Sequence, residues 1–132
     1  MQRFAVRFSS FLMAWLASCS SPTAADTGAA TFDVEVSSEV FTVRVATEAQ
    51  ANELRARLRT GARGVISGSL ARGDGGFNAP WLWHMTLESV HAPDVAIELC
   101  DGRPSMVDAD IGYWMGSVKQ YCPWAARVVR ER

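Results

Sequence analysis

Two side chains of the sequence could form an acid–base pair, and their placement depends on how two apolar segments fold. His84 belongs to the alternating segment 81–87 and lies on the face opposite Trp83. Glu98 belongs to the apolar segment 95–99. If these segments were neighbouring strands, His84 and Glu98 could meet across them. We expect a structural pair rather than a catalytic one, because no motif supplies a nucleophile or a second acid. A small enzyme that uses His84 with Glu98 is the alternative.

The histidines and the glycine-rich segment give no sign of a metal or phosphate site. His84 and His91 have no cysteine or acid at ligand spacing. Segment 73–80 is rich in glycine, but it lacks the Lys-Ser/Thr end of a phosphate-binding loop and is not followed by a helical pattern. We therefore expect no cofactor and no metal, and an exposed hairpin loop at 73–80.

The N-terminal segment predicts export and lipid attachment. Arg3 and Arg7 precede an apolar run at 8–17. The run is too short to cross a bilayer, and a basic start followed by a short apolar run fits a signal peptide. Residues 16–19, Leu-Ala-Ser-Cys, resemble the lipobox of bacterial lipoproteins, in which the thiol takes a diacylglycerol before cleavage at its amino side. The resemblance implies lipid on Cys19, and two or more acyl chains give stable anchoring. A plain signal peptide cleaved further along the chain and an ordinary buried helix are the alternatives.

These features divide the chain into three parts. They predict a signal peptide at 1–18, a flexible tether at 19–30 and one globular domain at 31–132. The expected location is the cell envelope, on the outer membrane if the host has two, because Ser20 rather than an Asp follows the cysteine. The net charge of −1 gives no reason to expect a nucleic-acid partner.

Cysteine parity predicts a disulfide. The chain has three cysteines, and assigning Cys19 to lipid leaves Cys100 and Cys122 as one pair in an oxidising compartment. A redox-active or metal-binding pair is the alternative, but the spacing is not CxxC and no histidine or third cysteine flanks either residue. A structural disulfide between Cys100 and Cys122 is therefore expected.

Apolar periodicity predicts an α+β fold, with one helix packed on a mainly antiparallel sheet and a single disulfide. The helix is expected to end at residue 60, because Thr47 and Gln50 can form a capping box before it and Gly61 follows it. Apolar and alternating segments predict strands at 32–36, 41–45, 65–71, 81–87 and 95–99, with a last strand or helical turn at 128–129. Pro104 suits the first turn of a short helix.

Four tryptophans follow the tether, and they divide into two groups. Trp83 lies in an alternating segment, which predicts a core position, and Trp124 is expected to pack over the disulfide because it lies near Cys122. Trp81 lies at the exit of the glycine-rich loop and Trp114 in an irregular segment, so both could be half exposed. Aromatic side chains beside such a loop are typical of a binding patch. The candidate binding surface consists of Phe77, Asn78, Trp81 and Trp114.

From residue 41 to residue 129 the chain resembles a known family. The matching pieces are a Phe-x-Val strand at 41–43, a helix that ends near Gly61, Asn78-x-Pro80-Trp81-x-Trp83-His84, Ile97-Glu98-x-Cys100-Asp101 and Cys122-Pro123-Trp124-x-x-Arg127. Together they are similar to the N-terminal domain of a slime-mould calmodulin-binding protein, a domain found also in short bacterial proteins. Between residues 104 and 121 the acidic helix of that family is shorter and poorer in acids. The resemblance implies no established activity.

Calmodulin is not an expected partner. A calmodulin target is a basic amphipathic helix with bulky anchors, whereas the expected helix offers only Leu54 and Leu58, and a bacterial envelope lacks calmodulin. The expected partners are the membrane, through the lipid anchor, and an extracytoplasmic protein or small ligand. A binding or interaction domain without enzymatic activity is the favoured function. A small envelope enzyme and a purely structural envelope protein are the alternatives.

Overall fold

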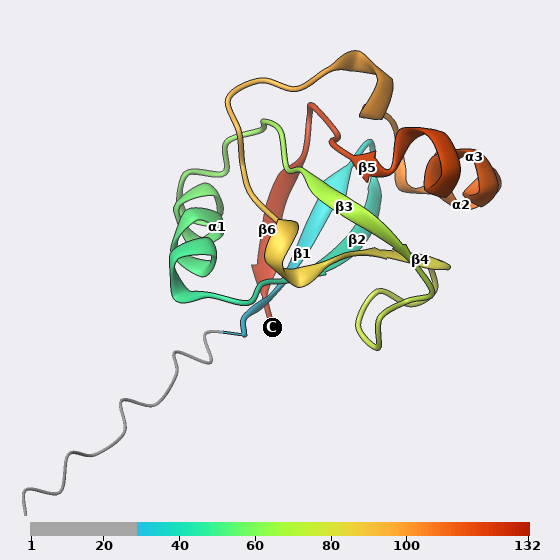
Figure 1. Cartoon of the computed structure of the whole chain (residues 1–132). Helices are drawn as coiled ribbons and strands as arrows, with labels where there is room; N and C mark the ends of the chain where they lie inside the picture. The colour runs from blue at the N-terminus through green and yellow to red at the C-terminus, as the bar shows by residue number, and fades with distance from the viewer. Residues whose placement is uncertain (1–28) are drawn as a thin grey trace, which may run out of the picture.

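The strands of the fold form two three-stranded antiparallel sheets. The computed structural model describes residues 29–132, so the predicted signal peptide at 1–18, Cys19 and the tether up to residue 28 lie outside the described residues. The strands are β1 (Thr31–Val36), β2 (Glu39–Arg44), β3 (Gly68–Arg72), β4 (Trp83–Met85), β5 (Gln120–Tyr121) and β6 (Arg127–Glu131). The sheets have the orders β2-β1-β6 and β4-β3-β5 (Figure 1). The predicted α+β class is confirmed, with two small sheets in place of one.

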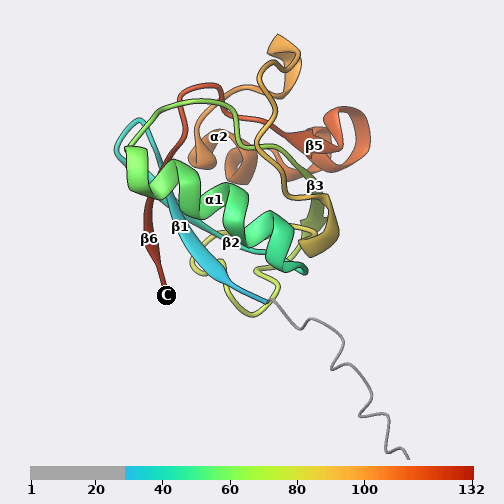
Figure 2. The same cartoon turned by 90° about the vertical axis from the view of Figure 1, so that its left-hand side faces the viewer.

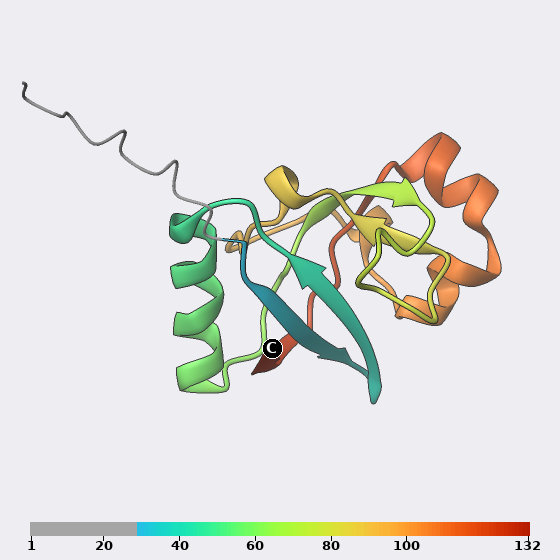
Figure 3. The ribbon, with the colours of Figure 1, turned by 90° about the horizontal axis from the view of Figure 1, so that it is seen from below.

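Helices lie at both ends of the sheets. At one end is α1 (Glu48–Thr60), and at the other are α2 (Pro104–Ala109) and α3 (Ile111–Tyr113) (Figure 3). α1 packs against β6, and α2 packs against β2. Shorter helical turns occupy Leu87–Ser89, Glu98–Cys100 and Trp114–Val118. The short helix predicted from Pro104 is confirmed.

The ends of α1 follow from local sequence. The Thr47 side chain accepts a hydrogen bond from the backbone N–H of Gln50, and the Gln50 side chain accepts one from the backbone N–H of Thr47. Gly61 ends the helix in the left-handed conformation with φ 66°, and its N–H donates to the carbonyl of Arg57. The predicted helix is confirmed, with the capping box and the terminal glycine in the predicted places.

Alternation along the strands decides which side chains of the first sheet enter the core. β1 pairs with β2 at Phe32–Val43 and Val34–Phe41, and with β6 at Val34–Val128. All five side chains are buried. The strands predicted at 32–36 and 41–45 are confirmed, and Val128 and Val129 belong to a strand.

The opposite face of the first sheet holds a buried carboxylate, Asp33. Thr42 Oγ1 donates to Asp33 Oδ1 at 2.9 Å, Arg130 contacts Oδ2 at 2.6 Å, and Arg132 Nε donates to Oδ1 at 2.9 Å. Burial raises the pKa of Asp33, but the hydrogen bond from Thr42 and the two guanidinium groups outweigh it. The pKa of Asp33 therefore lies below its ordinary value.

Aromatic rings fill the space between the two sheets. The Trp83 ring of β4 lies 5.5 Å from the Phe41 ring of β2 and 5.2 Å from the Tyr121 ring of β5. Trp114 packs edge-on against Tyr121 with ring centroids 6.0 Å apart. The Tyr121 hydroxyl donates to the carbonyl of Gly102 at 2.7 Å. The predicted core position of Trp83 is confirmed.

Asn78 connects the two sheets with one buried side chain. Its Oδ1 accepts a hydrogen bond from the Thr42 N–H of β2 at 2.7 Å, and its Nδ2 donates to the Trp83 carbonyl of β4 at 2.7 Å. Trp81 Nε1 donates to the Val40 carbonyl, also on β2, at 2.8 Å. β2 is an edge strand, and the loop between β3 and β4 therefore covers part of its free edge.

Three predicted strands differ from the structure. The strand expected at 65–71 begins later, as β3 at Gly68–Arg72, and Gly64 and Ser67 before it form only isolated bridges. The strand expected at 81–87 is confined to Trp83–Met85. The strand expected at 95–99 is wrong, because the segment leads into a helical turn at Glu98–Cys100 and its apolar side chains are exposed. The neighbouring pair of Ser67 with His91 is an isolated bridge, and no strand lies beside residues 95–99 in the described chain.

The bridging amide predicts a large effect for Asn78→Ala. The substitution leaves the Thr42 N–H and the Trp83 carbonyl buried without partners, so we expect a loss of about 2–4 kcal/mol in the free energy of unfolding. Asn52→Ala, at an exposed position of α1, is the control and should change it by less than about 0.5 kcal/mol. Urea unfolding measures both. Equal stability of the two variants would rule out the bridging role.

The Asp33 cluster predicts a pH-dependent effect for Asp33→Asn. Because the pKa of Asp33 is lowered in the folded state, its stabilisation is present above the ordinary carboxyl pKa and is lost as the pH falls through the folded value. We expect Asp33→Asn to cost about 1–3 kcal/mol at pH 7, and the cost should shrink between about pH 4 and pH 2. The control is Asp94→Asn, at an exposed carboxylate. A cost that does not change with pH would contradict this account.

Candidate functional site

The residues predicted as a binding surface do not form one. Phe77, Asn78 and Trp114 are buried, and of the four only Trp81 is partly exposed. The predicted patch is therefore wrong. Asn78 is occupied by its hydrogen bonds to both sheets, and Trp114 packs on the ring of Tyr121. The glycine-rich loop does connect the antiparallel strands β3 and β4, but it folds its large side chains inward.

The structure does not bring His84 and Glu98 together. His84 Nδ1 lies 2.8 Å from the carbonyl oxygen of Gly73, and the imidazole packs edge-on against Phe77. Glu98 is exposed on a helical turn in the orange segment at the top of Figure 1, away from β4. The sheet neighbour of β4 is β3, and the strand that would have carried Glu98 does not form. The hypothesis of a catalytic pair loses its geometric basis.

A cluster of exposed apolar side chains lies elsewhere, on residues 92–99, which we name the arch. Val95, Ile97 and Leu99 are 82%, 59% and 56% exposed. Trp124, in the segment that precedes β6, is 43% exposed. Single exposed apolar residues are common on protein surfaces, but several large ones grouped together are typical of an interaction site.

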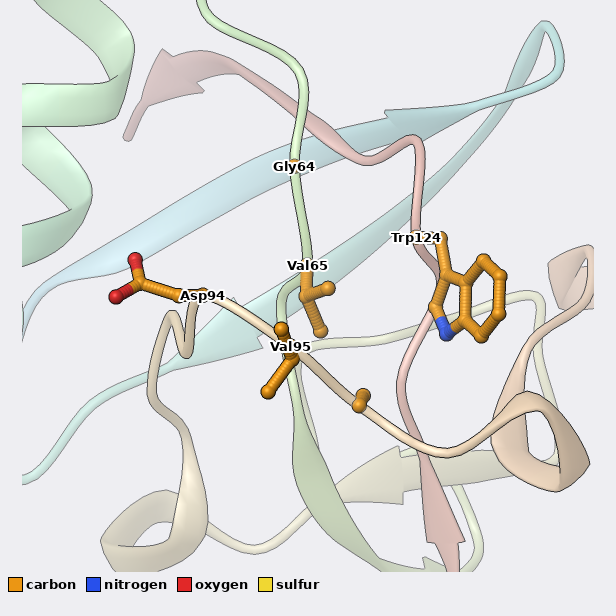
Figure 4. Close-up of a pocket in the computed structure, with 6 residues that line it drawn as sticks. Gly64, Val65, Asp94, Val95 and Trp124 are labelled. Atoms are coloured by element: carbon orange, nitrogen blue, oxygen red, sulfur yellow. The ribbon is translucent and has the colours of Figure 1, made fainter.

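A groove lies between the arch and the segment that leads into β3. Its volume is about 300 Å³. The residues that line it are Gly64, Val65, Asp94, Val95, Ala96 and Trp124. Figure 4 shows Asp94 and Trp124 at opposite ends, with Val65 and Val95 between them. The Trp124 ring, expected over the disulfide, is exposed and lines this groove.

Covalent and hydrogen bonds fix both ends of the arch. At the far end, Cys100 is joined to Cys122 with a Cα–Cα distance of 5.1 Å, and the Cys122 N–H donates to the Cys100 carbonyl at 2.8 Å. The predicted structural disulfide is confirmed. At the near end, His91 and Ser67 exchange two backbone hydrogen bonds of 2.8 and 3.0 Å. The Ala92 N–H donates to the Glu53 carboxylate of α1 at 3.0 Å.

Charged groups border the groove unevenly. Asp94 lines it, and Glu98 follows on the same arch. Asp101 Oδ1 is occupied, since it accepts hydrogen bonds from the N–H groups of Gly102 and Trp124 at 2.9 Å each. The Arg57 guanidinium of α1 lies against Gly64, so close that a Cβ at that glycine would meet it. The groove thus offers an apolar floor, an acidic side and one cationic group near Gly64.

The groove has the features of a binding surface. Within residues 29–132 no three His, Cys, Asp or Glu side chains are grouped closely enough to hold a metal ion. In the same part of the chain, no helix is both long and apolar enough to cross a membrane. An apolar concave surface with a few polar groups at its rim can bind an apolar side chain or small apolar group.

The groove could not be predicted from alternation, because alternation at 95–99 indicates a strand. Val95, Ile97 and Leu99 have the period of a half-buried strand, yet their side chains are in solvent. One sequence signal points the other way. Pro93 lies two residues before Val95, and a proline argues against a strand that is paired on both edges.

The comparisons with known proteins agree with the motif resemblance. The family model described as the BP-74 N-terminal domain matches residues 28–132. No curated protein and no solved structure matches the chain. The matched range contains the buried Asn78, the aromatic core, the disulfide and the arch. Because the match covers most of the chain, this protein belongs to the family of that N-terminal domain.

Proposed function

We propose that this protein is a lipid-anchored binding module of the bacterial cell envelope, held by lipid on Cys19 and binding its ligand in the groove beside Trp124. The observation that carries the binding role is that two exposed apolar side chains, Val95 and Trp124, line a concave surface. Ile97 and Leu99, further along the same arch, are exposed as well. Burying one such side chain contributes roughly 1.5–3 kcal/mol. Exposed apolar side chains do not contribute this free energy in the unliganded domain, and a partner that covers them would provide it.

The position of the arch supports a partner other than the anchoring membrane. The described chain begins at the lower end of Figure 1, where β1 starts, and the arch lies at the upper end. The view turned by 90° gives the same separation (Figure 2). An anchor at Cys19 would reach the domain through the tether at the end where β1 starts, and the groove lies at the other end. A ligand outside the membrane, such as an extracytoplasmic protein, fits this placement.

The anchor predicts acylation of the mature N-terminus. We expect mass spectrometry of the membrane fraction to find Cys19 as the first residue, carrying a diacylglycerol on the thiol. Cys19→Ser should move the protein out of the membrane fraction, because without acyl chains no other strong membrane affinity is expected. A soluble, unacylated mature protein in the native host would refute the anchor and leave the groove proposal standing.

The groove predicts a site-specific contact in the native envelope. A photo-crosslinking amino acid in place of Val95 should give a discrete adduct, because this side chain is 82% exposed at the groove. The control position is Leu82, which is 63% exposed but lies outside the groove. Trp124→Ala combined with the label at Val95 should reduce the yield at least tenfold. Equal adducts from both positions, or none from Val95, would count against the groove as the binding surface.

A further inference from the structure

The backbone of Val65 forms an open edge on the floor of the groove. Residues 64–67 are extended, and their hydrogen bonds alternate between two sides of the chain. On one side, Gly64 exchanges two hydrogen bonds with Ala126, and the Ile66 N–H donates to Pro123. On the other side, Ser67 exchanges two with His91. Alternation therefore directs the N–H and C=O of Val65 to the side of His91 and the arch.

Neither backbone group of Val65 has a hydrogen-bond partner within residues 29–132. Val65 is nevertheless only 7% exposed. Unpaired backbone groups are rare at such positions, because a buried N–H or C=O without a partner is destabilising. Because Val65 also lines the groove, we infer that a ligand in the groove can supply the missing partners.

Pro93 explains why the arch does not pair with Val65. The antiparallel register set by Ser67 and His91 would continue two residues on, with Val65 opposite Pro93. A proline has no N–H, so it cannot donate to the Val65 carbonyl. The arch leaves the ladder at this position, and the groove is the space that opens between the two segments.

We propose that the groove binds an extended peptide segment of a partner protein, which pairs with the free N–H and C=O of Val65 as an added strand. This inference rests on the proposed function of the groove. One apolar side chain of the peptide lies between Val95 and Trp124, and the main chain supplies the two hydrogen bonds that the arch does not form with Val65. A short peptide held in this way binds weakly, with a Kd of about 10 µM to 1 mM.

The charges around the groove indicate which type of residue in the peptide lies next to its apolar side chain. Residues 92–102 include Asp94, Glu98 and Asp101 and no Lys or Arg. Asp94 lies at the end of the groove away from Trp124 (Figure 4). A Lys or Arg of the peptide faces this end, while Arg57 lies against Gly64 and is available to a peptide carbonyl. The same acidic residues disfavour an anionic lipid surface as the occupant.

The first experiment measures amide hydrogen exchange of the unliganded full chain in detergent. We expect the Val65 amide to exchange at least about tenfold faster than those of Gly64 and Ser67, which are hydrogen bonded. Pro93→Ala adds an N–H that can donate to the Val65 carbonyl, which lets the ladder continue so that the Val65 N–H donates to the carbonyl of residue 93. Exchange at Val65 should then slow by a similar factor. Equal protection of the three amides in the native chain would overturn the open edge.

The second experiment uses random heptapeptides displayed on phage and selected against the full chain. We expect selected peptides to contain an apolar residue next to Lys or Arg, and to lose at least tenfold in affinity for Trp124→Ala and for Pro93→Ala. The matched control is Leu82→Ser, which should bind as the native chain does. N-methylation of the peptide amides at the apolar residue and its neighbours should abolish binding, and bound peptide should slow exchange at Val65.

The outcomes separate the added strand from the groove itself. Peptides that depend on Trp124 but tolerate N-methylation, with exchange at Val65 unchanged, would overturn the added strand and leave the groove as a binding surface. Selection of no peptide with a Kd below about 1 mM, or binding that is indifferent to Trp124→Ala, would overturn both.

Discussion

The buried amide of Asn78 is the interaction on which the arrangement of the two sheets depends. Each sheet has only three strands, and a sheet of this size is marginal by itself. Asn78 meets an N–H of one sheet and a C=O of the other, so both backbone groups are satisfied where the sheets adjoin. The ring of Trp83 is thereby held against Phe41 and Tyr121. The aromatic core and the fold of the glycine-rich loop follow from this placement.

This role of Asn78 changes the interpretation of the family motif at residues 78–84, which had been expected to contribute to a binding surface. Asn78 and Trp81 cover the edge of β2, and Trp83 belongs to the core. The motif therefore describes how the domain is built rather than what it binds. Side chains committed to satisfying buried polar groups are unavailable to a ligand. The surface available for recognition lies in the arch, where the apolar side chains have no such task.

The arch is stable in an exposed conformation because both of its ends are fixed. The disulfide joins Cys100 to the segment before β6, and His91 is paired with Ser67. Fixing both ends reduces the conformational entropy of the segment between them. Exposed apolar side chains can then hold a defined position without packing into a core of their own. A rigid frame around an apolar surface with unpaired backbone groups lowers the entropy that a ligand must overcome when it binds.

The sequence by itself determined the features that depend on nearby residues. Local hydrogen bonding and periodicity predicted the helix at 48–60 with both caps, the two alternating strands near the start of the domain and the core position of Trp83. The number of cysteines predicted the Cys100–Cys122 pair. Only the tertiary structure decided which side chains are free. Phe77 and Trp114 are buried and Val95 is exposed because of packing between segments distant in the chain, and alternation alone cannot distinguish a paired strand from an unpaired arch.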